Sequence, residues 1–268
     1  RELRMNPFGS VAELSMRLRS GELSALEVLA AALRRIGHPD SGLPAYVTVA
    51  PDHALDEATR LDARRLRGDT LGPLHGVPIT IKESFDLVDT ATTAGLTHRA
   101  RHRAGKDAWV VSRLRQAGAI VLGKTNVSQL LFHGSCRNPV YGRTNNPWQP
   151  DRSPGASSGG EAAILAVGGS ALGIGSDIGG SVRLPADACG VNSLKPTSGR
   201  LPLEGHISFL PGLETLMCQP GPLARSVTDL MLAMRVLTDA ATAPHRTGLH
   251  GLRIGFHTDN GVVRPSPA

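Results

Sequence analysis

Two short clusters of serine and glycine, at residues 155–160 and 177–181, contain the residue types that acyl-transfer chemistry requires. A serine hydroxyl supplies a nucleophile, and glycines allow backbone N–H groups to approach a developing oxyanion. A single apolar segment separates the clusters, so they are close together in the sequence. This spacing identifies residues 153–186 as the candidate active site.

The first cluster reads Gly-Ala-Ser-Ser-Gly-Gly over residues 155–160 and offers the hydroxyls of Ser157 and Ser158. Its first five residues match the G-x-S-x-G nucleophile elbow, which requires a strand directly before the serine. The preceding residues 146–154 are typical of a loop, so an α/β-hydrolase elbow is not supported. The alternative interpretation is a flexible turn that caps a helix near Glu161.

The second cluster reads Asp-Ile-Gly-Gly-Ser over residues 177–181. Its last four residues present successive backbone N–H groups that can converge on an anion. These residues are Ile178, Gly179, Gly180 and Ser181. An ordinary glycine-rich strand exit is the alternative. The nearby Gly173-x-Gly175 does not support a dinucleotide site, because a third glycine at the required spacing is missing.

Lys82 ends an apolar stretch and is one of only four lysines among 29 lysine and arginine residues. A chain that relies on arginine for surface charge can keep lysine for roles that arginine cannot fill. A desolvated lysine can lose its proton and act as a base, whereas arginine stays charged. The alternative is a lysine that extends from a strand end towards water.

Taken together, the lysine, the serines and the glycine clusters resemble the amidase signature family. The resemblance covers most of the chain and includes five further stretches, at residues 72–82, 120–126, 138–148, 190–197 and 221–226. Residues 138–148 and the Ser-Ser-Gly-Gly-Glu161 run look most like the fatty-acid-amide-hydrolase and fungal-acetamidase branch. The amidotransferase A-type branch usually has serine in place of Glu161. Ala156 also replaces a glycine that is usual in the family.

The resemblance implies a Ser–cis-Ser–Lys triad, a variant of the serine-based triads. Ser181 matches the acylated nucleophile, and Ser157 matches the bridging serine that follows a cis peptide bond. Lys82 matches the general base. The N–H groups of residues 178–181 match the oxyanion hole. The family mechanism needs no metal ion or other cofactor.

The implied reaction is hydrolysis of a carboxylic amide of a small molecule through an acyl-enzyme. Leu131 and Phe132 lie where related hydrolases line their acyl site, which favours an apolar acyl group. Two alternatives stay open. One is an amidotransferase A-type subunit that supplies ammonia to a partner, which Glu161 disfavours. The other is a catalytically inert fragment.

The elements that position these residues alternate between helices and short apolar strands, which predicts an α/β fold with a sheet covered on both faces. The family resemblance implies an α/β/α sandwich around a mixed sheet. Capping boxes at Ser10–Glu13 and Ser24–Glu27 begin two helices that run to about residues 19 and 35. The other predicted helices cover 53–66, 107–116, 161–167 and 226–238, with a start at 128–132; the predicted strands cover 79–85, 119–123, 170–175 and 252–256.

Residues 1–268 are expected to form one domain, the N-terminal portion of an amidase signature domain whose C-terminal part is missing. A Ser-Pro-Ala run at residues 266–268 resembles the start of a helix. Residues 137–154 are expected to form a long loop.

Bulk composition excludes several classes of protein. The net charge of +6 comes from scattered basic residues and only 3% of residues are aromatic, so nucleic-acid binding is not supported. No apolar run is long enough to span a membrane, and no signal peptide opens the chain. Three separated cysteines indicate free thiols in a reducing, cytoplasmic setting. A homodimer stays open.

Overall fold

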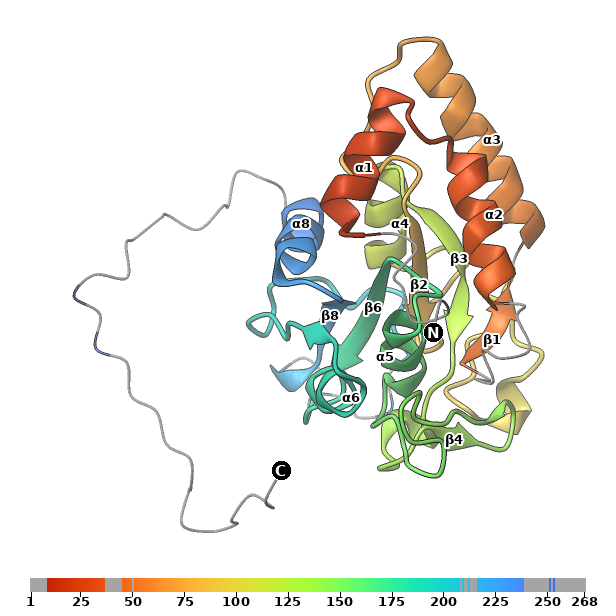
Figure 1. The fold of residues 1–268 in the computed structure, drawn as a ribbon. Coiled ribbons are helices and arrows are strands. Elements are labelled where there is room, and N and C mark those ends of the chain that lie inside the picture. Colours follow the sequence, from red (N-terminus) through yellow and green to blue (C-terminus); the bar gives the residue numbers. More distant parts are fainter. Residues whose placement is uncertain are drawn as a thin grey trace.

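The computed structural model describes residues 9–36, 45–49, 51–207, 209, 212, 216–238, 251 and 253. Within them a mixed sheet of six strands runs through the molecule (Figure 1). Its order is β1 (Tyr46–Val49), β3 (Ile120–Thr125), β2 (Pro78–Lys82), β6 (Leu172–Asp177), β8 (Gln219–Ala224) and β7 (Asn192–Ser193). The three central strands β3, β2 and β6 are parallel, and the outer strands pair antiparallel. The predicted α/β fold with a mixed sheet is confirmed.

Five helices contribute to the larger of two hydrophobic clusters: α1 (Val11–Ser20), α2 (Ala25–Ile36), α3 (Pro51–Leu66), α4 (Trp109–Gln116) and α8 (Val227–Thr238). Both predicted capping serines are in place. Ser10 Oγ accepts from the Glu13 N–H at 3.1 Å, and Ser24 Oγ accepts from the Glu27 N–H at 3.1 Å. These bonds satisfy N–H groups that a helix start otherwise leaves unpaired.

The opposite face of the sheet carries α5 (Gly159–Ala166) and α6 (Arg183–Cys189), which form the smaller cluster with Leu223 of β8 (Figure 1). Strand β2 shows how the two faces differ. Ile79 and Ile81 pack in the larger cluster, whereas Thr80 and Lys82 bond to residues near α5. Alternation along one strand therefore delivers the lysine to the α5 side of the sheet.

Glu161 ties α5 to the sheet. Its carboxylate accepts hydrogen bonds from the hydroxyls of Thr80 in β2 and Thr125 in β3, each at 2.7 Å. Burial raises the pKa of Glu161 to about 8, although both hydroxyls favour the ionised form. Gly173 of β6 lies directly beneath the carboxylate, and a Cβ there would overlap Oε2.

Some elements were not predicted from the sequence. Strand β8 contains Pro220 and Pro222, which lack the N–H that a strand normally donates and so hide the strand in the sequence. The seven-residue α6 carries Pro185 in its first turn, where a helix needs no N–H donor. The two-residue strand β7 and the edge strand β1 are short and carry little periodic signal.

Two predictions near the site were wrong in detail. A helix was expected to begin at residues 128–132, but the structure has only a 3₁₀ turn, η4 (Gln129–Leu131). Leu130 and Leu131 both have positive φ, of 56° and 59°, which stops helix propagation. The expected loop at 137–154 contains a small hairpin, β4 (Arg137–Asn138) with β5 (Gly142–Arg143).

The remaining predictions divide into two groups. The predicted strand at 252–256 and the helix start at 266–268 lie outside the described residues. The three cysteines are free, as expected, and all three are buried. None of the helices in the described part of the chain has the length and hydropathy to span a bilayer.

The close approach of Gly173 to Glu161 predicts that a single methyl group added at Gly173 destabilises the protein. Gly173→Ala should reduce the free energy of unfolding by about 1–3 kcal/mol, because the added methyl displaces a carboxylate that two hydroxyls hold. The measurement is urea unfolding. Gly105→Ala, where nothing lies within 4 Å, is the control and should change stability by at most about 0.5 kcal/mol. Equal losses of stability in the two variants would contradict the close contact between Gly173 and Glu161.

Candidate active site

Lys82 is the last residue of β2 and is fully buried. Its Nζ contacts three oxygens: Ser157 Oγ at 2.7 Å, Ser176 Oγ at 2.8 Å and the Ser176 carbonyl oxygen at 3.1 Å. All three partners are uncharged, so no ion pair stabilises the ammonium directly. The lysine predicted to be a base therefore sits in a site that favours its neutral form.

The pKa of Lys82 reflects this environment. Burial lowers it from its ordinary 10.5 to about 8. Acidic groups further away oppose the shift: Cys218, Asp177, Cys136 and Glu161. A lysine with a pKa near 8 is partly neutral near neutral pH, so it can accept a proton there.

The first serine–glycine cluster brings Ser157 to the lysine. The Ala156–Ser157 peptide bond is cis, as the family resemblance implied. Gly155 has φ of 81°, and a Cβ there would lie 2.7 Å from the Cα of Pro185, so the backbone of this turn packs directly against α6. The Ser158 N–H donates to the carbonyl oxygen of Ser181 at 3.1 Å, which joins the first cluster to the second.

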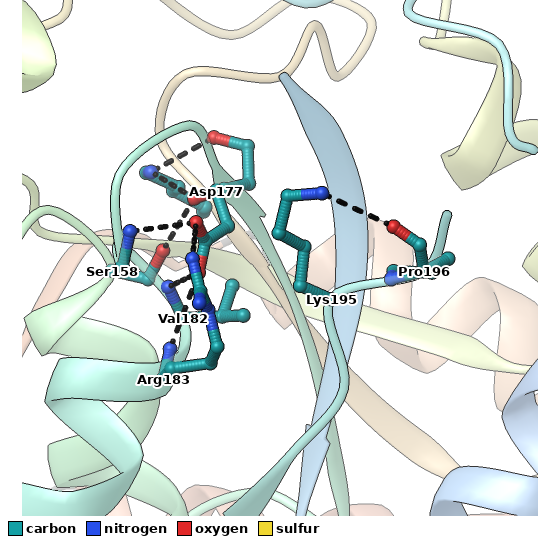
Figure 2. Close-up of polar contacts among 9 residues, drawn as sticks. Ser158, Asp177, Val182, Arg183, Lys195 and Pro196 are labelled. Atoms are coloured by element: carbon teal, nitrogen blue, oxygen red, sulfur yellow. Dashed lines mark hydrogen bonds and ion pairs between the residues drawn. The ribbon is translucent and has the colours of Figure 1, made fainter. Parts of the chain in front are cut away.

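Asp177 organises the second cluster (Figure 2). Its buried carboxylate accepts from the N–H of Gly180 at 2.7 Å and of Val182 at 3.0 Å. The Arg183 guanidinium donates to both carboxylate oxygens, at 3.0 and 2.9 Å. Burial alone would raise the pKa of Asp177, but these donors outweigh it and hold the pKa at about 2. The aspartate is therefore a fixed negative charge around which residues 178–183 fold.

This arrangement separates the four predicted oxyanion donors. The Gly180 N–H is used by Asp177. In the described part of the chain, the N–H groups of Ile178, Gly179 and Ser181 donate to no protein acceptor. Three of the four predicted donors are therefore available to a ligand, and Gly180 instead holds the turn in shape.

A cavity of about 600 Å³ lies beside both clusters. Its wall is mostly apolar and comprises Leu130, Leu131, Phe132, Ser157, Ser176, Ile178, Gly179, Ser181, His206, Phe209 and Cys218. The structure thus brings the two predicted serines and the two predicted substrate-binding residues to one cavity. Lys82 lies behind Ser157. Among the described residues no hydrogen bond joins the hydroxyls of Ser157 and Ser181, which is common in a site without substrate.

Five residues of the cavity wall were not predicted: Leu130, Ser176, His206, Phe209 and Cys218. Ser176 precedes Asp177 at the end of β6, so its position at a strand end was a usable signal. His206 and Cys218 come from segments without periodic pattern, and only the folded chain places them at the site.

The small number of lysines in the sequence identified the candidate base only in part. Lys124 is also buried, and burial lowers its pKa to about 8, but it donates to the Ala91 carbonyl and to Thr92 Oγ1 instead of to a serine of the clusters. Lys106 forms an exposed ion pair with Glu204. Rarity of lysine therefore predicts burial for two residues, and only the contacts distinguish the candidate base.

Comparisons with known proteins identify similar sequences and structures. A family model described as Amidase matches residues 27–268. The A subunit of glutamyl-tRNA(Gln) amidotransferase from Thermobifida fusca is 44% identical over 83% of this chain and 44% of its own length. Indoleacetamide hydrolase of Bradyrhizobium diazoefficiens is 42% identical over 85% of this chain and 44% of its own length. The chain spans about half the length of the curated relatives it matches.

Solved structures show the same similarity. Fatty acid amide hydrolase superposes with a TM-score of 0.83 and 35% identity, covering 87% of this chain and 41% of that one. Peptide amidase from Stenotrophomonas maltophilia superposes with a TM-score of 0.80 and 35% identity, covering 90% of this chain and 52% of that one.

Because the Asp177 carboxylate holds the turn at residues 178–183, removing that side chain should markedly destabilise the protein. Asp177→Ala should lower the free energy of unfolding by about 2–4 kcal/mol, because the N–H groups it holds lose their acceptor. The control, Asp69→Ala, removes an exposed partner of Arg67 and should cost at most about 1 kcal/mol.

The pH dependence of that loss has a definite sign. The pKa of Asp177 is depressed in the fold, so its stabilisation is complete above the unfolded-state pKa of about 3.9 and fades as the pH falls towards 2. Urea unfolding of both proteins from pH 3 to pH 8 measures it. A difference between wild type and variant that grew on acidification would contradict the assignment.

Proposed function

The chain belongs to the amidase family, and on that premise we propose that it hydrolyses carboxylic amides through an acyl-enzyme formed at Ser181. The observation that carries the proposal is the 2.7 Å contact between Nζ of the buried Lys82 and Oγ of Ser157, beside a cavity that Ser181 also lines. In this proposal Lys82 is the base, Ser157 is the hydroxyl that relays the proton, and Ser181 is the nucleophile.

In the proposed mechanism the proton moves in two linked steps. Neutral Lys82 takes the proton of Ser157, and Ser157 takes the proton of Ser181. The Ser181 oxygen attacks the amide carbonyl, and the carbonyl electron pair moves to oxygen. The protonated lysine then returns a proton through Ser157 to the nitrogen, the C–N bond breaks and the amine leaves. Water repeats the sequence on the ester, which releases the acid and restores Ser181.

The developing oxyanion needs donors that are already oriented. The N–H groups of Ile178, Gly179 and Ser181 are suited to this because the carboxylate of Asp177 fixes the turn that carries them. Removing one such donor from an oxyanion hole typically costs about a hundredfold to a thousandfold in rate. Preorganisation of this turn is therefore expected to be a main part of the catalysis.

The cavity wall supports an apolar substrate group. Leu130, Leu131, Phe132 and Phe209 contribute to it, and its polar side chains are Ser157, Ser176, Ser181, His206 and the Cys218 thiol. We propose small-molecule amides with an aliphatic or aryl acyl group as substrates. The reaction requires no metal or other cofactor. A cytoplasmic location and a homodimer stay predictions.

A second candidate function is that of an amidotransferase A-type subunit, because the relative from Thermobifida fusca carries that name at 44% identity. The buried Glu161 that bonds to Thr80 and Thr125 is the residue by which the sequence departs from that branch. Glutamine-dependent ammonia release that rises when a partner protein is added would favour the amidotransferase. Hydrolysis of simple amides without a partner would favour the hydrolase.

The nucleophile is tested by substitution and labelling. Ser181→Ala should lower amide hydrolysis by at least about a thousandfold, because no other group replaces the attacking oxygen. A fluorophosphonate probe should label Ser181 in the wild type, read by intact mass and peptide mapping. The exposed Ser198→Ala is the control and should label normally. An unlabelled wild type would instead support an inert fragment.

The base is tested by its pH dependence. The neutral form of Lys82 predominates above its pKa, so the wild-type rate should rise as the pH passes through about 8. Lys82→Ala should lose about a hundredfold or more near pH 7 and recover part of it at higher pH, where hydroxide can act. Lys82→Arg keeps the positive charge but cannot deprotonate, and should stay inactive throughout. A Lys82→Ala profile parallel to the wild type would rule out this role.

A further inference from the structure

Among the described residues that line the cavity, His206 and Cys218 are titratable and have no role in the proposed mechanism. Its backbone forms an isolated antiparallel bridge with Phe85, and the neighbouring Ile207 N–H donates to the Ser84 carbonyl at 2.9 Å. The imidazole packs edge to face against the ring of Phe85, with centroids 4.7 Å apart. These contacts fix the ring beside the end of β2, close to the candidate base.

The ring is joined to Lys82 through one hydroxyl. His206 Nε2 lies 2.9 Å from Ser176 Oγ, and Ser176 Oγ lies 2.8 Å from Lys82 Nζ. Ser176 thus has one hydroxyl hydrogen and two neighbours that compete for it. Which neighbour receives that hydrogen decides how the lysine is oriented.

The protonated state of Lys82 settles the direction. An ammonium has three N–H donors and no acceptor, and Nζ has three oxygen partners. Each oxygen therefore accepts from the lysine, and the Ser176 hydroxyl must donate elsewhere. His206 Nε2 is the acceptor in reach, which makes the ring neutral with its proton on Nδ1.

The same pattern remains useful after the lysine loses a proton. Neutral Lys82 has two N–H groups and one lone pair. One N–H must go to the Ser176 carbonyl oxygen, which cannot donate. Because the Ser176 hydroxyl already donates to His206, the second N–H goes to Ser176 Oγ, and the lone pair faces Ser157.

We propose that His206 is a positioning residue that accepts the Ser176 hydroxyl hydrogen and thereby directs the lone pair of Lys82 towards Ser157; the inference rests on the proposed hydrolase function. Without an acceptor at this position, the Ser176 hydroxyl turns to the lysine lone pair. The lysine then donates to Ser157 and cannot take its proton.

The charge balance around the site keeps the imidazole in this role. Burial, with the positive charge of Lys82 nearby, lowers the pKa of His206 well below its usual range, so the ring is neutral near pH 7. The other titratable groups that face Lys82 come from four different segments: Cys218, Asp177, Cys136 and Glu161. All four are anionic when charged, and among the described residues Ser176 Oγ contacts only Lys82 Nζ and His206 Nε2.

Two variants of nearly equal size distinguish the effect of the hydrogen-bond acceptor at residue 206 from the effect of side-chain volume. His206→Gln places an amide oxygen near the position of Nε2, whereas His206→Met fills a similar volume with a much weaker acceptor. Both lose the aromatic contact with Phe85, so their stabilities should match in thermal unfolding. The readout is the rate of Ser181 labelling by a fluorophosphonate, separated into maximal rate and half-saturating concentration, from pH 6 to pH 10.

The proposal expects the Gln variant to keep at least about a third of the maximal labelling rate and the Met variant to fall by about tenfold or more, at similar half-saturation. The acidic limb of the Met profile should also move to lower pH, because the Ser176 hydroxyl then stabilises the neutral lysine. Ser176→Ala should remove most of the difference between Gln and Met, since the hydroxyl that links the two residues is absent.

Equal maximal rates in the Gln and Met variants, or a change confined to half-saturation, would overturn the proposal and make His206 a wall residue of the cavity. The same difference between Gln and Met in the Ser176→Ala background would also overturn it. Failure of the proposed function is distinguishable, because it would appear as a wild type that the probe does not label at Ser181.

Discussion

The site depends on one buried ammonium group that has neutral oxygens as its only direct partners in the described chain. Lys82 Nζ is surrounded by two serine hydroxyls and one carbonyl, while the carboxylates of Asp177 and Glu161 act on it from further away. A contacting carboxylate would keep the lysine charged and useless as a base. The fold instead gives Asp177 its own guanidinium and gives Glu161 two threonine hydroxyls. Each acid is satisfied separately, which keeps both away from the lysine.

The strands explain how neutral partners reach the lysine. Strands β2 and β6 are parallel neighbours, so their carboxyl ends place Lys82 and Ser176 at the same edge of the sheet. Such edges commonly carry the ligand sites of α/β proteins. Strand β8 runs antiparallel to β6, so Cys218, just before its first residue, reaches the same edge. Helix α5 then begins at this edge and supplies Ser157 from its N-terminal side.

Sequence patterns predicted the parts of this arrangement that depend on neighbouring residues. They missed the parts that depend on contacts between residues far apart in the sequence. The roles expected for Ser157 and Ser181 are implied by the family resemblance. Serine–glycine clusters and capping boxes are short and can be read from neighbouring residues, so the two clusters and the starts of α1 and α2 could be predicted. Strand β8 could not, because Pro220 and Pro222 argue against a strand unless its pairing partners are known. The use of the Gly180 N–H by Asp177 and the contact between Ser176 Oγ and His206 Nε2 exist only in the folded chain.

The separation of the lysine from its partners along the chain has a consequence for synthesis. Ser157 and Ser176 follow Lys82 by 75 and 94 positions, and the bonds between them close long loops. Loop closure of this kind is entropically costly and slow, and parallel strand pairing adds to the delay. On the ribosome Lys82 therefore emerges well before any of its three oxygens. Until Ser157 and Ser176 are synthesised and the sheet has formed, Lys82 is an ordinary hydrated lysine, so the nascent chain carries no activated base.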